Sequence, residues 1–219
     1  MMSSLPTGFT DNSVTQIDGL VVKTGKNVSD EKAWYEAYLD KGDIPRIVGL
    51  EGSSLVMKFI ERSGCLDTGE VIKVVEKYKR YKPLSSLPWD AYIDRIYRHL
   101  VTNDKIHNGG KLLEKLRNLK LPHTFCHGDL SVYNIIPTTE GIKLIDPLYS
   151  DNKFGSYLLD YAKLLFSIKF YQGDARLFKD LYKKIDLYFM DILIAAECVR
   201  VSGYKKQFSF IAENLINEL

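Results

Sequence analysis

An aspartate, an asparagine and a second aspartate are spaced along the run HGDLSVYNIIPTTEGIKLIDP, which begins at His127. Asn134 follows Asp129 by five residues, and Asp146 ends an apolar run twelve residues beyond Asn134. Phosphoryl transfer uses one carboxylate to orient or deprotonate the attacking hydroxyl, and amide and carboxylate oxygens to hold magnesium against the nucleotide phosphates. We therefore predict the first role for Asp129 and metal binding by Asn134 and Asp146.

The segments around these residues must bring the three side chains to one place. Short strand signals at 124–127 and 142–145 flank the loop that contains Asp129. That loop can fold back so that Asp129 and Asn134 face one cleft, while the strand at 142–145 delivers Asp146 from the adjacent edge. An HGD tripeptide alone says little, but the asparagine and the strand-borne aspartate argue against a chance match.

Two neighbours of Asp129 are assigned to support of the loop. His127 is expected to brace it through packing and hydrogen bonds. Gly128 permits a backbone shape that residues with side chains resist.

The rest of the chain divides into a strand-rich part and a helical part. Upstream of about residue 65, one helical pattern lies among strand-like runs, with the helix at 30–39 and the strands at 19–24, 44–50 and 54–60. Apolar residues recur at helical spacing from 70 to 121 and from 156 to the C-terminus. We expect an α+β fold of two lobes: a small β-rich, nucleotide-binding lobe at 1–62, and a mainly helical lobe at 63–219 with the catalytic hairpin and the acceptor site.

Composition excludes several other classes of protein. A chain of 219 residues with 45% hydrophobic residues can fill one domain or two small lobes. Its 30 basic and 28 acidic residues leave a net charge of +2, which indicates no nucleic-acid partner. Nothing in the sequence indicates an oligomeric state.

The cysteines and the N-terminus bear on the compartment. The three cysteines are far apart and lack C-x-x-C spacing, which argues against a disulfide framework or a zinc site. No basic and apolar leader begins the chain, and no run reaches the roughly 18 apolar residues needed to span a bilayer. We expect a soluble, cytoplasmic protein without membrane insertion.

The central run also resembles a known family. HGDLSVYNII followed by IKLIDP is similar to the catalytic loop and metal-binding motif of aminoglycoside and choline kinase-like phosphotransferases. GSYLLDYAKLLFSI, from Gly155 to Ile168, resembles a helix of that family and places Asp160 at its acidic position, where we expect it to brace the loop backbone. The resemblance covers roughly residues 12–170 and implies a protein-kinase-like fold that binds ATP and Mg²⁺ between its lobes. Similar proteins among surface-polysaccharide and lipopolysaccharide gene products imply a sugar-like acceptor.

The family likeness also implies residues in the N-terminal lobe that hold the nucleotide. Such kinases need a strand lysine for the phosphates and a helix glutamate that holds the lysine, and Lys23 and Glu31 are the candidates. Phe59 and Ile60 are expected at the hinge, whose backbone would bind adenine. The place of a longer phosphate-covering loop is taken by residues 10–13, with Ser13 as the candidate nucleotide contact.

Other interpretations of these residues stay open. Lys23 also fits a solvated lysine at a strand end, with Lys58 as the substitute. Glu31 also fits a carboxylate that interacts with the dipole at a helix N-terminus. The shortened phosphate-covering segment would suit a binding module without turnover, although the presence of all three loop residues argues against it. Transfer of the nucleotide's AMP is a third possibility.

For the acceptor, a sugar or polyol is the first choice. Choline or ethanolamine is second; an aminoglycoside would want an acidic pocket, which a pI of 8.2 does not suggest. A protein acceptor is third, because no long activation segment follows Asp146. Tyr149, Tyr157 and Tyr171 come soon after the motif and could line an acceptor pocket. The fourteen tyrosines also suggest an aromatic cage for choline, but most have the spacing of helix core residues and fit packing better.

Overall fold

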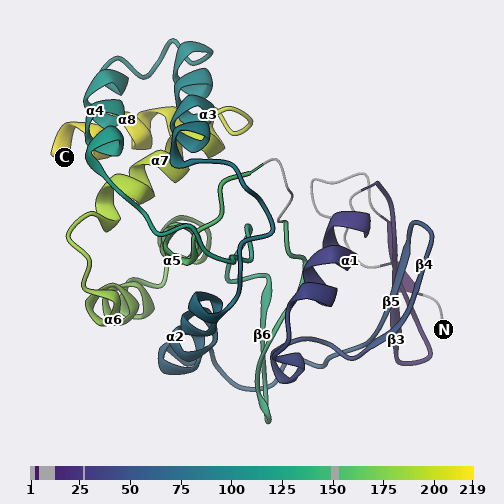
Figure 1. The fold of residues 1–219 in the computed structure, drawn as a ribbon. Coiled ribbons are helices and arrows are strands. Elements are labelled where there is room, and N and C mark those ends of the chain that lie inside the picture. The colour runs from purple at the N-terminus through teal and green to yellow at the C-terminus, as the bar shows by residue number, and fades with distance from the viewer. Residues whose placement is uncertain (1–2, 5–12, 27, 149–152) are drawn as a thin grey trace.

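The computed structural model describes residues 3–4, 13–26, 28–148 and 153–219. Its elements fall into two lobes, with a sheet and helix α1 on one side and most of the helices on the other (Figure 1). The two termini lie at opposite sides of the molecule. The expected two-lobed α+β architecture is confirmed.

The first lobe contains one helix and a five-stranded antiparallel sheet in the order β1-β2-β3-β5-β4. Its elements are β1 (Ser3–Ser4), β2 (Ser13–Ile17), β3 (Leu20–Thr24), α1 (Val28–Ala37), β4 (Ile47–Glu51) and β5 (Ser54–Lys58). The sequence did not predict β1 and β2.

The second lobe contains a two-stranded hairpin among helices. Its elements are α2 (Thr68–Lys77), α3 (Trp89–Val101), α4 (Gly109–Asn118), β6 (Ile135–Thr138), β7 (Gly141–Leu144), α5 (Tyr157–Ser167), α6 (Ala175–Ile185), α7 (Met190–Ser202) and α8 (Phe208–Glu218). Short 3-10 turns lie at Lys41–Asp43 and Tyr78–Arg80, and a π-helical turn at Ile168–Gln172 extends α5.

Strand alternation places Lys23 on the inner face of the sheet. Lys23 on β3 pairs with Leu55 on β5, and residues directly opposite in an antiparallel pair share a face. Leu55 is buried, as is Met57 two residues further along the same face. Because α1 contacts β5, the inner face of the sheet is the one covered by the helix that carries Glu31.

An aromatic cluster joins α1 to the helical lobe. Trp34 of α1, and Tyr38 just after the end of that helix, pack against Tyr78 and Phe125 with ring centroids 5.5 to 6.4 Å apart. The Trp34 Nε1–H also donates to the Cys126 carbonyl oxygen at 2.7 Å. The helix that carries Glu31 is therefore fixed to the segment that leads into His127.

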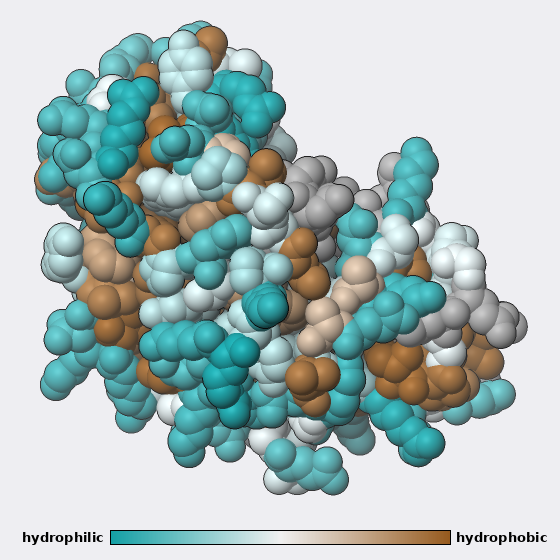
Figure 2. All heavy atoms as spheres, viewed as in Figure 1, coloured by the Kyte–Doolittle hydropathy of each residue, from teal (hydrophilic) through white to brown (hydrophobic). Residues whose placement is uncertain are grey.

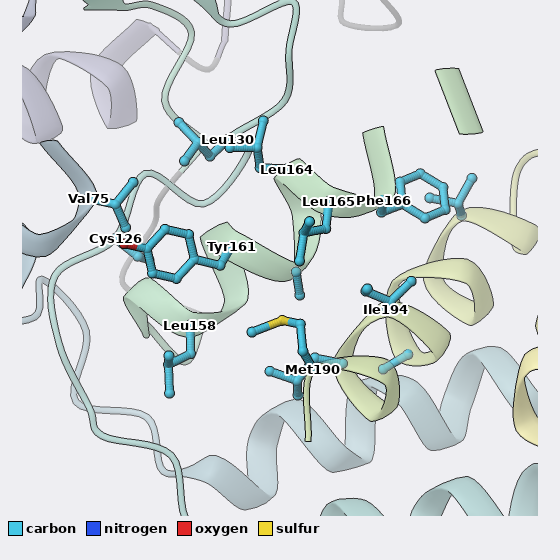
Figure 3. Close-up of a cluster of buried hydrophobic side chains, with 14 of the residues drawn as sticks. Val75, Cys126, Leu130, Leu158, Tyr161, Leu164, Leu165, Phe166, Met190 and Ile194 are labelled. Atoms are coloured by element: carbon cyan, nitrogen blue, oxygen red, sulfur yellow. The ribbon is translucent and has the colours of Figure 1, made fainter. Parts of the chain in front are cut away.

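Helix α5 is the central helix of the second lobe. Figure 3 shows side chains of α5, including Leu158, Tyr161 and Leu165, gathered with Met190 and Ile194 of α7. Leu130 of the loop and Val75 of α2 lie in the same cluster. Burial of these apolar side chains holds the loop that contains Leu130 between α5 and the first lobe.

One strand prediction was wrong. Residues 124–127 form no strand; the hairpin consists of β6 and β7, with Ile135 opposite Leu144. Phe125 is buried by packing on Trp34 instead, so its apolar character needs no partner strand. Pro137, which disfavours a central strand, is tolerated in β6 because a two-stranded hairpin has only edges.

The outer surface is mostly polar on the face seen in Figure 2, where apolar side chains form separate patches. Of the helices in the described ranges, none combines the length and apolar character needed to cross a membrane.

Candidate active site

Lys23 lies between two carboxylates. Its Nζ is 2.5 Å from Glu31 Oε1 and 3.0 Å from Asp146 Oδ1. Lys23 and Glu31 are 6% and 3% exposed, whereas the Asp146 side chain is 48% exposed. The contact with Asp146, 123 residues away in sequence, joins the first lobe to the end of the hairpin.

The charge states follow from burial and from these contacts. Burial disfavours the charged form of Lys23, but Asp146 and Glu31 outweigh it and raise the pKa of the ammonium above its ordinary value. Burial raises the pKa of Glu31 to about 7, and the attraction of Lys23 limits that rise. Lys23 therefore stays charged at neutral pH.

Asp129 and Asn134 meet across the loop between them. Asn134 Nδ2 donates to the Asp129 carbonyl oxygen at 2.8 Å and to its Oδ2 at 3.2 Å. The Asp129 side chain keeps 33% of its surface exposed, so one side of it can reach a bound molecule. The loop folds back as the sequence suggested.

Hydrogen bonds of Ile145 with the loop fix the position of Asp146, the next residue in the chain. The Ile145 N–H donates to the Asn134 carbonyl oxygen at 3.0 Å, and the Ile145 carbonyl oxygen lies 3.0 Å from His127 Nε2. Asp146 itself has φ +55°, a left-handed conformation that aspartate adopts more readily than most residues. The backbone thus presents Asp146 beside the loop while its side chain reaches Lys23.

His127 has a structural position. It is fully buried, packs at the edge of Trp34, and its Nδ1 has no hydrogen-bond partner in the described part of the chain. Burial lowers its pKa to about 4, so the ring is neutral and Nε2–H donates to Ile145. His127 thus contacts both α1 and the residue before Asp146, and its role as a brace stays a prediction.

Asp160 holds the backbone of the same loop from α5. Its Oδ2 accepts from the His127 N–H at 2.6 Å and its Oδ1 accepts from the Gly128 N–H at 2.9 Å. Gly128 has φ +81°, where a glycine is favoured. Burial raises the pKa of Asp160 to about 7, and the two backbone donors limit that rise.

Lys163 is a residue of the site that was not predicted from the sequence. Lys163 Nζ lies 3.1 Å from Asp129 Oδ1 and 4.0 Å from Glu197 Oε2, and the residue is only 7% exposed. It stands three residues after Asp160, so both side chains leave α5 on the face toward the loop. The sequence feature that could have indicated Lys163 is its place in the otherwise apolar run DYAKLLF, because a buried lysine needs a charged or hydrogen-bonding partner.

The protein oxygens of the site can hold magnesium only if the phosphates of a bound nucleotide supply further oxygen ligands. The described residues contain no cluster of three or more His, Cys, Asp or Glu side chains that could hold a metal ion. Asn134 directs its amide nitrogen to Asp129, which leaves its Oδ1 as an oxygen donor, and Asp146 is half exposed. Magnesium commonly takes one or two protein oxygens plus phosphates and waters, so Asn134 and Asp146 suit it.

The predicted nucleotide contacts lie on the first lobe. Ser13 begins β2, is exposed, and its Oγ lies 2.5 Å from Thr24 Oγ1 on β3. The Phe59 N–H already donates to the Gly19 carbonyl oxygen, whereas the Ile60 backbone has no bond within the described ranges. Ile60 is thus the freer of the two predicted hinge residues.

The larger of two pockets, ≈580 Å³, is lined by Phe59 and Ile60 but not by Lys23, Asn134 or Asp146. Phosphates at those three residues would therefore lie outside it. The smaller pocket, ≈170 Å³, is lined by Gly128 and Lys163 and lies beside the loop that contains Asp129. Tyr157 and Tyr171 are not among its lining residues, and Tyr149 and residues 10–12 lie outside the described residues.

Comparison with known proteins gives a result for structure alone, since no family model and no curated protein matches the sequence. Choline kinase LicA from Streptococcus pneumoniae superposes with a TM-score of 0.70 at 16% identity, over 100% of this chain and 92% of that one. The fold is protein-kinase-like.

Two further solved structures of this fold are similar. A protein from Haemophilus somnus assigned as a fructosamine-3-kinase gives a TM-score of 0.63 at 15% identity, over 100% of this chain and 90% of that one. A thermostable mutant of aminoglycoside phosphotransferase APH(4)-Ia, in complex with AMP-PNP and hygromycin B, gives a TM-score of 0.68 at 12% identity, over 99% of this chain and 92% of that one. At such identities the likeness shows the fold, which confirms the protein-kinase-like architecture expected from the motif.

Proposed function

We propose that this protein transfers the γ-phosphoryl group of ATP to a hydroxyl group of a small molecule, with a sugar or polyol as the acceptor. The observation that carries the proposal is the contact of Lys23 with both Glu31 and Asp146, directly beside the loop that holds Asp129 and Asn134. The three similar structures are a choline kinase, a protein assigned as a fructosamine-3-kinase and an aminoglycoside phosphotransferase that holds AMP-PNP, which supports a small molecule as the acceptor.

Each residue has a role in that reaction. Lys23 would hold the nucleotide phosphates, and Glu31 would orient Lys23. Asp129 would orient and deprotonate the acceptor hydroxyl, which then attacks the γ-phosphorus as the bond to ADP breaks. Asn134 and Asp146 would hold Mg²⁺, which would neutralise charge on the phosphates. Most of the rate enhancement would come from positioning and electrostatics.

Other residues serve binding and support. The Ile60 and Phe59 backbone would bind adenine, Ser13 would contact the nucleotide, and His127 and Asp160 would keep the loop in shape. We place the lobe boundary at residues 62 and 63, between the end of β5 and the start of α2. A cytoplasmic location and an association with surface-polysaccharide synthesis stay predictions.

The test is ATP consumption with Mg²⁺ across sugars, polyols, choline, ethanolamine and aminoglycosides, in parallel with an Asp129→Asn variant. We expect acceptor-dependent turnover that falls by at least 100-fold in the variant, because a positioned general base contributes about 10² to 10⁴ in rate. AMP-PNP affinity should be unchanged, since Asp129 is not assigned to the nucleotide.

Two other results would change the assignment. Nucleotide binding without turnover on any acceptor would favour a binding module. Absence of nucleotide binding would remove the kinase proposal altogether.

A further inference from the structure

A pocket of ≈170 Å³ opens beside the catalytic loop, between α3, α5 and α7. Gly128 of the loop lines it, and so does Lys163, whose ammonium contacts Asp129. An occupant of this pocket would therefore lie next to the carboxylate that we assign to the acceptor hydroxyl. Its volume is below the roughly 300 Å³ of sites for drug-sized ligands, so it suits a small molecule or one end of a larger one.

The lining of this pocket is strongly basic. Two acidic side chains, Asp160 and Glu197, face five cationic ones: Arg95, Arg98, Lys153, Lys163 and Arg200. Both acidic groups are already engaged, because Asp160 accepts from two backbone N–H groups and Glu197 lies 2.8 Å from Arg200.

Three of the cations have no acidic partner in the described part of the chain. Lys163 and Arg200 are paired with Asp129 and Glu197, whereas Arg95, Arg98 and Lys153 form no ion pair with a described residue. Among the described residues, Lys153 donates one hydrogen bond, to the Leu148 carbonyl oxygen at 3.3 Å. Arg95 and Lys153 are half-buried, so water screens their charges incompletely.

The repulsion among these cations is visible in their protonation. Burial lowers the pKa of Lys153 to about 8, and the charges of Arg95 and Arg200 add to that shift. Burial also lowers the pKa of Arg95, and Arg200 contributes. A bound anion would relieve both effects, whereas a quaternary ammonium ion or a polycation would be repelled.

We infer that the acceptor carries a negative charge and is a sugar or polyol with a carboxylate or phosphate group, which Arg95 and Lys153 bind while a hydroxyl lies at Asp129. This inference rests on the proposed function and names the class of its substrate. It separates this chain from kinases of cationic acceptors, because the same pocket would disfavour choline.

Matched acceptors test the inference. ATP-dependent phosphorylation would be measured with glucose, glucuronate, glucose 6-phosphate and choline on the full chain. We expect glucuronate or glucose 6-phosphate to have a kcat/KM at least tenfold above that of glucose, and choline to give no turnover. The better of the two anions distinguishes a carboxylate from a phosphate. Equal or better use of glucose or choline would overturn the inference.

Variants of the lining residues test whether the preference for an anionic acceptor comes from this pocket. Arg95→Gln and Lys153→Gln should each lower kcat/KM for the anionic acceptor by about tenfold, as expected for loss of one hydrogen bond to a charged group. The ratio of kcat/KM for the anionic acceptor to that for glucose should fall with it. Arg117→Gln, on an exposed position of α4, is the matched control and should behave like wild type. Unchanged use of the anion by both pocket variants would contradict the inference.

Binding gives a readout that does not need turnover. Calorimetry would measure AMP-PNP first, and then glucuronate and glucose 6-phosphate with AMP-PNP present. We expect saturable binding of one anion that is weakened about tenfold in Arg95→Gln, with AMP-PNP affinity unchanged. Nucleotide binding without binding of either anion would overturn this inference and leave the kinase proposal standing. Failure to bind AMP-PNP would instead show that the proposed function is wrong.

Discussion

Replacement of Lys23 by methionine should make the stability of the protein depend on pH through Glu31. Glu31 is 3% exposed, one of its oxygens contacts Lys23, and the other has no partner within the described residues. Burial already raises its pKa to about 7 while Lys23 is present. Without the lysine, burial and the charge of nearby Asp146 would raise it further.

The sign and size of this pH dependence follow from the linkage between proton binding and folding. An acid whose pKa is higher in the folded than in the unfolded state stabilises the fold at low pH, and that contribution is lost as pH rises through the folded pKa. Unfolded glutamate titrates near 4.3, and each pH unit between the two pKa values changes the free energy of unfolding by about 1.4 kcal/mol. Between pH 5 and pH 7, Lys23→Met should therefore lose about 2.7 kcal/mol relative to Lys23→Met/Glu31→Gln, in which this group no longer titrates.

Urea denaturation followed by tryptophan fluorescence at pH 5, 6, 7 and 8 would measure this. Lys32→Met is the matched control, because Lys32 faces only the exposed Glu36 at 3.8 Å, and pairs of that kind contribute about 0.3 to 0.5 kcal/mol. The reasoning would be refuted if Lys23→Met had the same pH dependence as Lys32→Met. It would also be refuted if the double variant were no more stable than Lys23→Met at pH 8.

Three further predictions concern the supports of the site and the acceptor pocket. Trp34→Phe should lower the free energy of unfolding by about 1 to 3 kcal/mol, because it leaves the buried Cys126 carbonyl without its donor; a loss below 0.5 kcal/mol in urea denaturation would contradict this. Lys163→Met should reduce kcat on the order of 100-fold through misplacement of Asp129, with AMP-PNP affinity unchanged, and an equal loss of nucleotide affinity would indicate a general structural defect instead. For an anionic acceptor, kcat/KM should fall as pH rises through about 8, where Lys153 loses its proton, and Lys153→Arg should move that fall to higher pH. An unchanged profile in Lys153→Arg would exclude Lys153 as the titrating group.

The local chemistry of the site was readable from the sequence. Asp129, Asn134 and Asp146 lie within eighteen consecutive residues, so a single loop and hairpin were bound to bring them close. The pairing of Glu31 with Lys23 was also readable, because three and four residues separate Glu31 from the buried Trp34 and Tyr35, which places it on the buried face of α1.

The strands of the hairpin were harder to predict from the sequence. Residues 124–127 include the apolar Phe125 and Cys126, but the burial of these two side chains involves packing on α1, which lies about ninety residues earlier, and not a partner strand. A short apolar run does not specify which kind of neighbour will cover it. Strand β6, which contains Pro137 and pairs only with β7 within the described residues, was also not predicted from the sequence.

The sequence by itself indicated the candidate reacting groups, predicted the two-lobed architecture and showed the likeness to kinase motifs, because these depend on residue types at short spacing. Only the tertiary structure decided what surrounds the acceptor. Arg95, Lys153 and Arg200 are roughly fifty residues apart, and each one alone resembles an ordinary solvated charge. The packing of α3, α5 and α7 brings them to one pocket beside Asp129. Because water screens their charges incompletely there, their combined positive charge favours an anionic ligand.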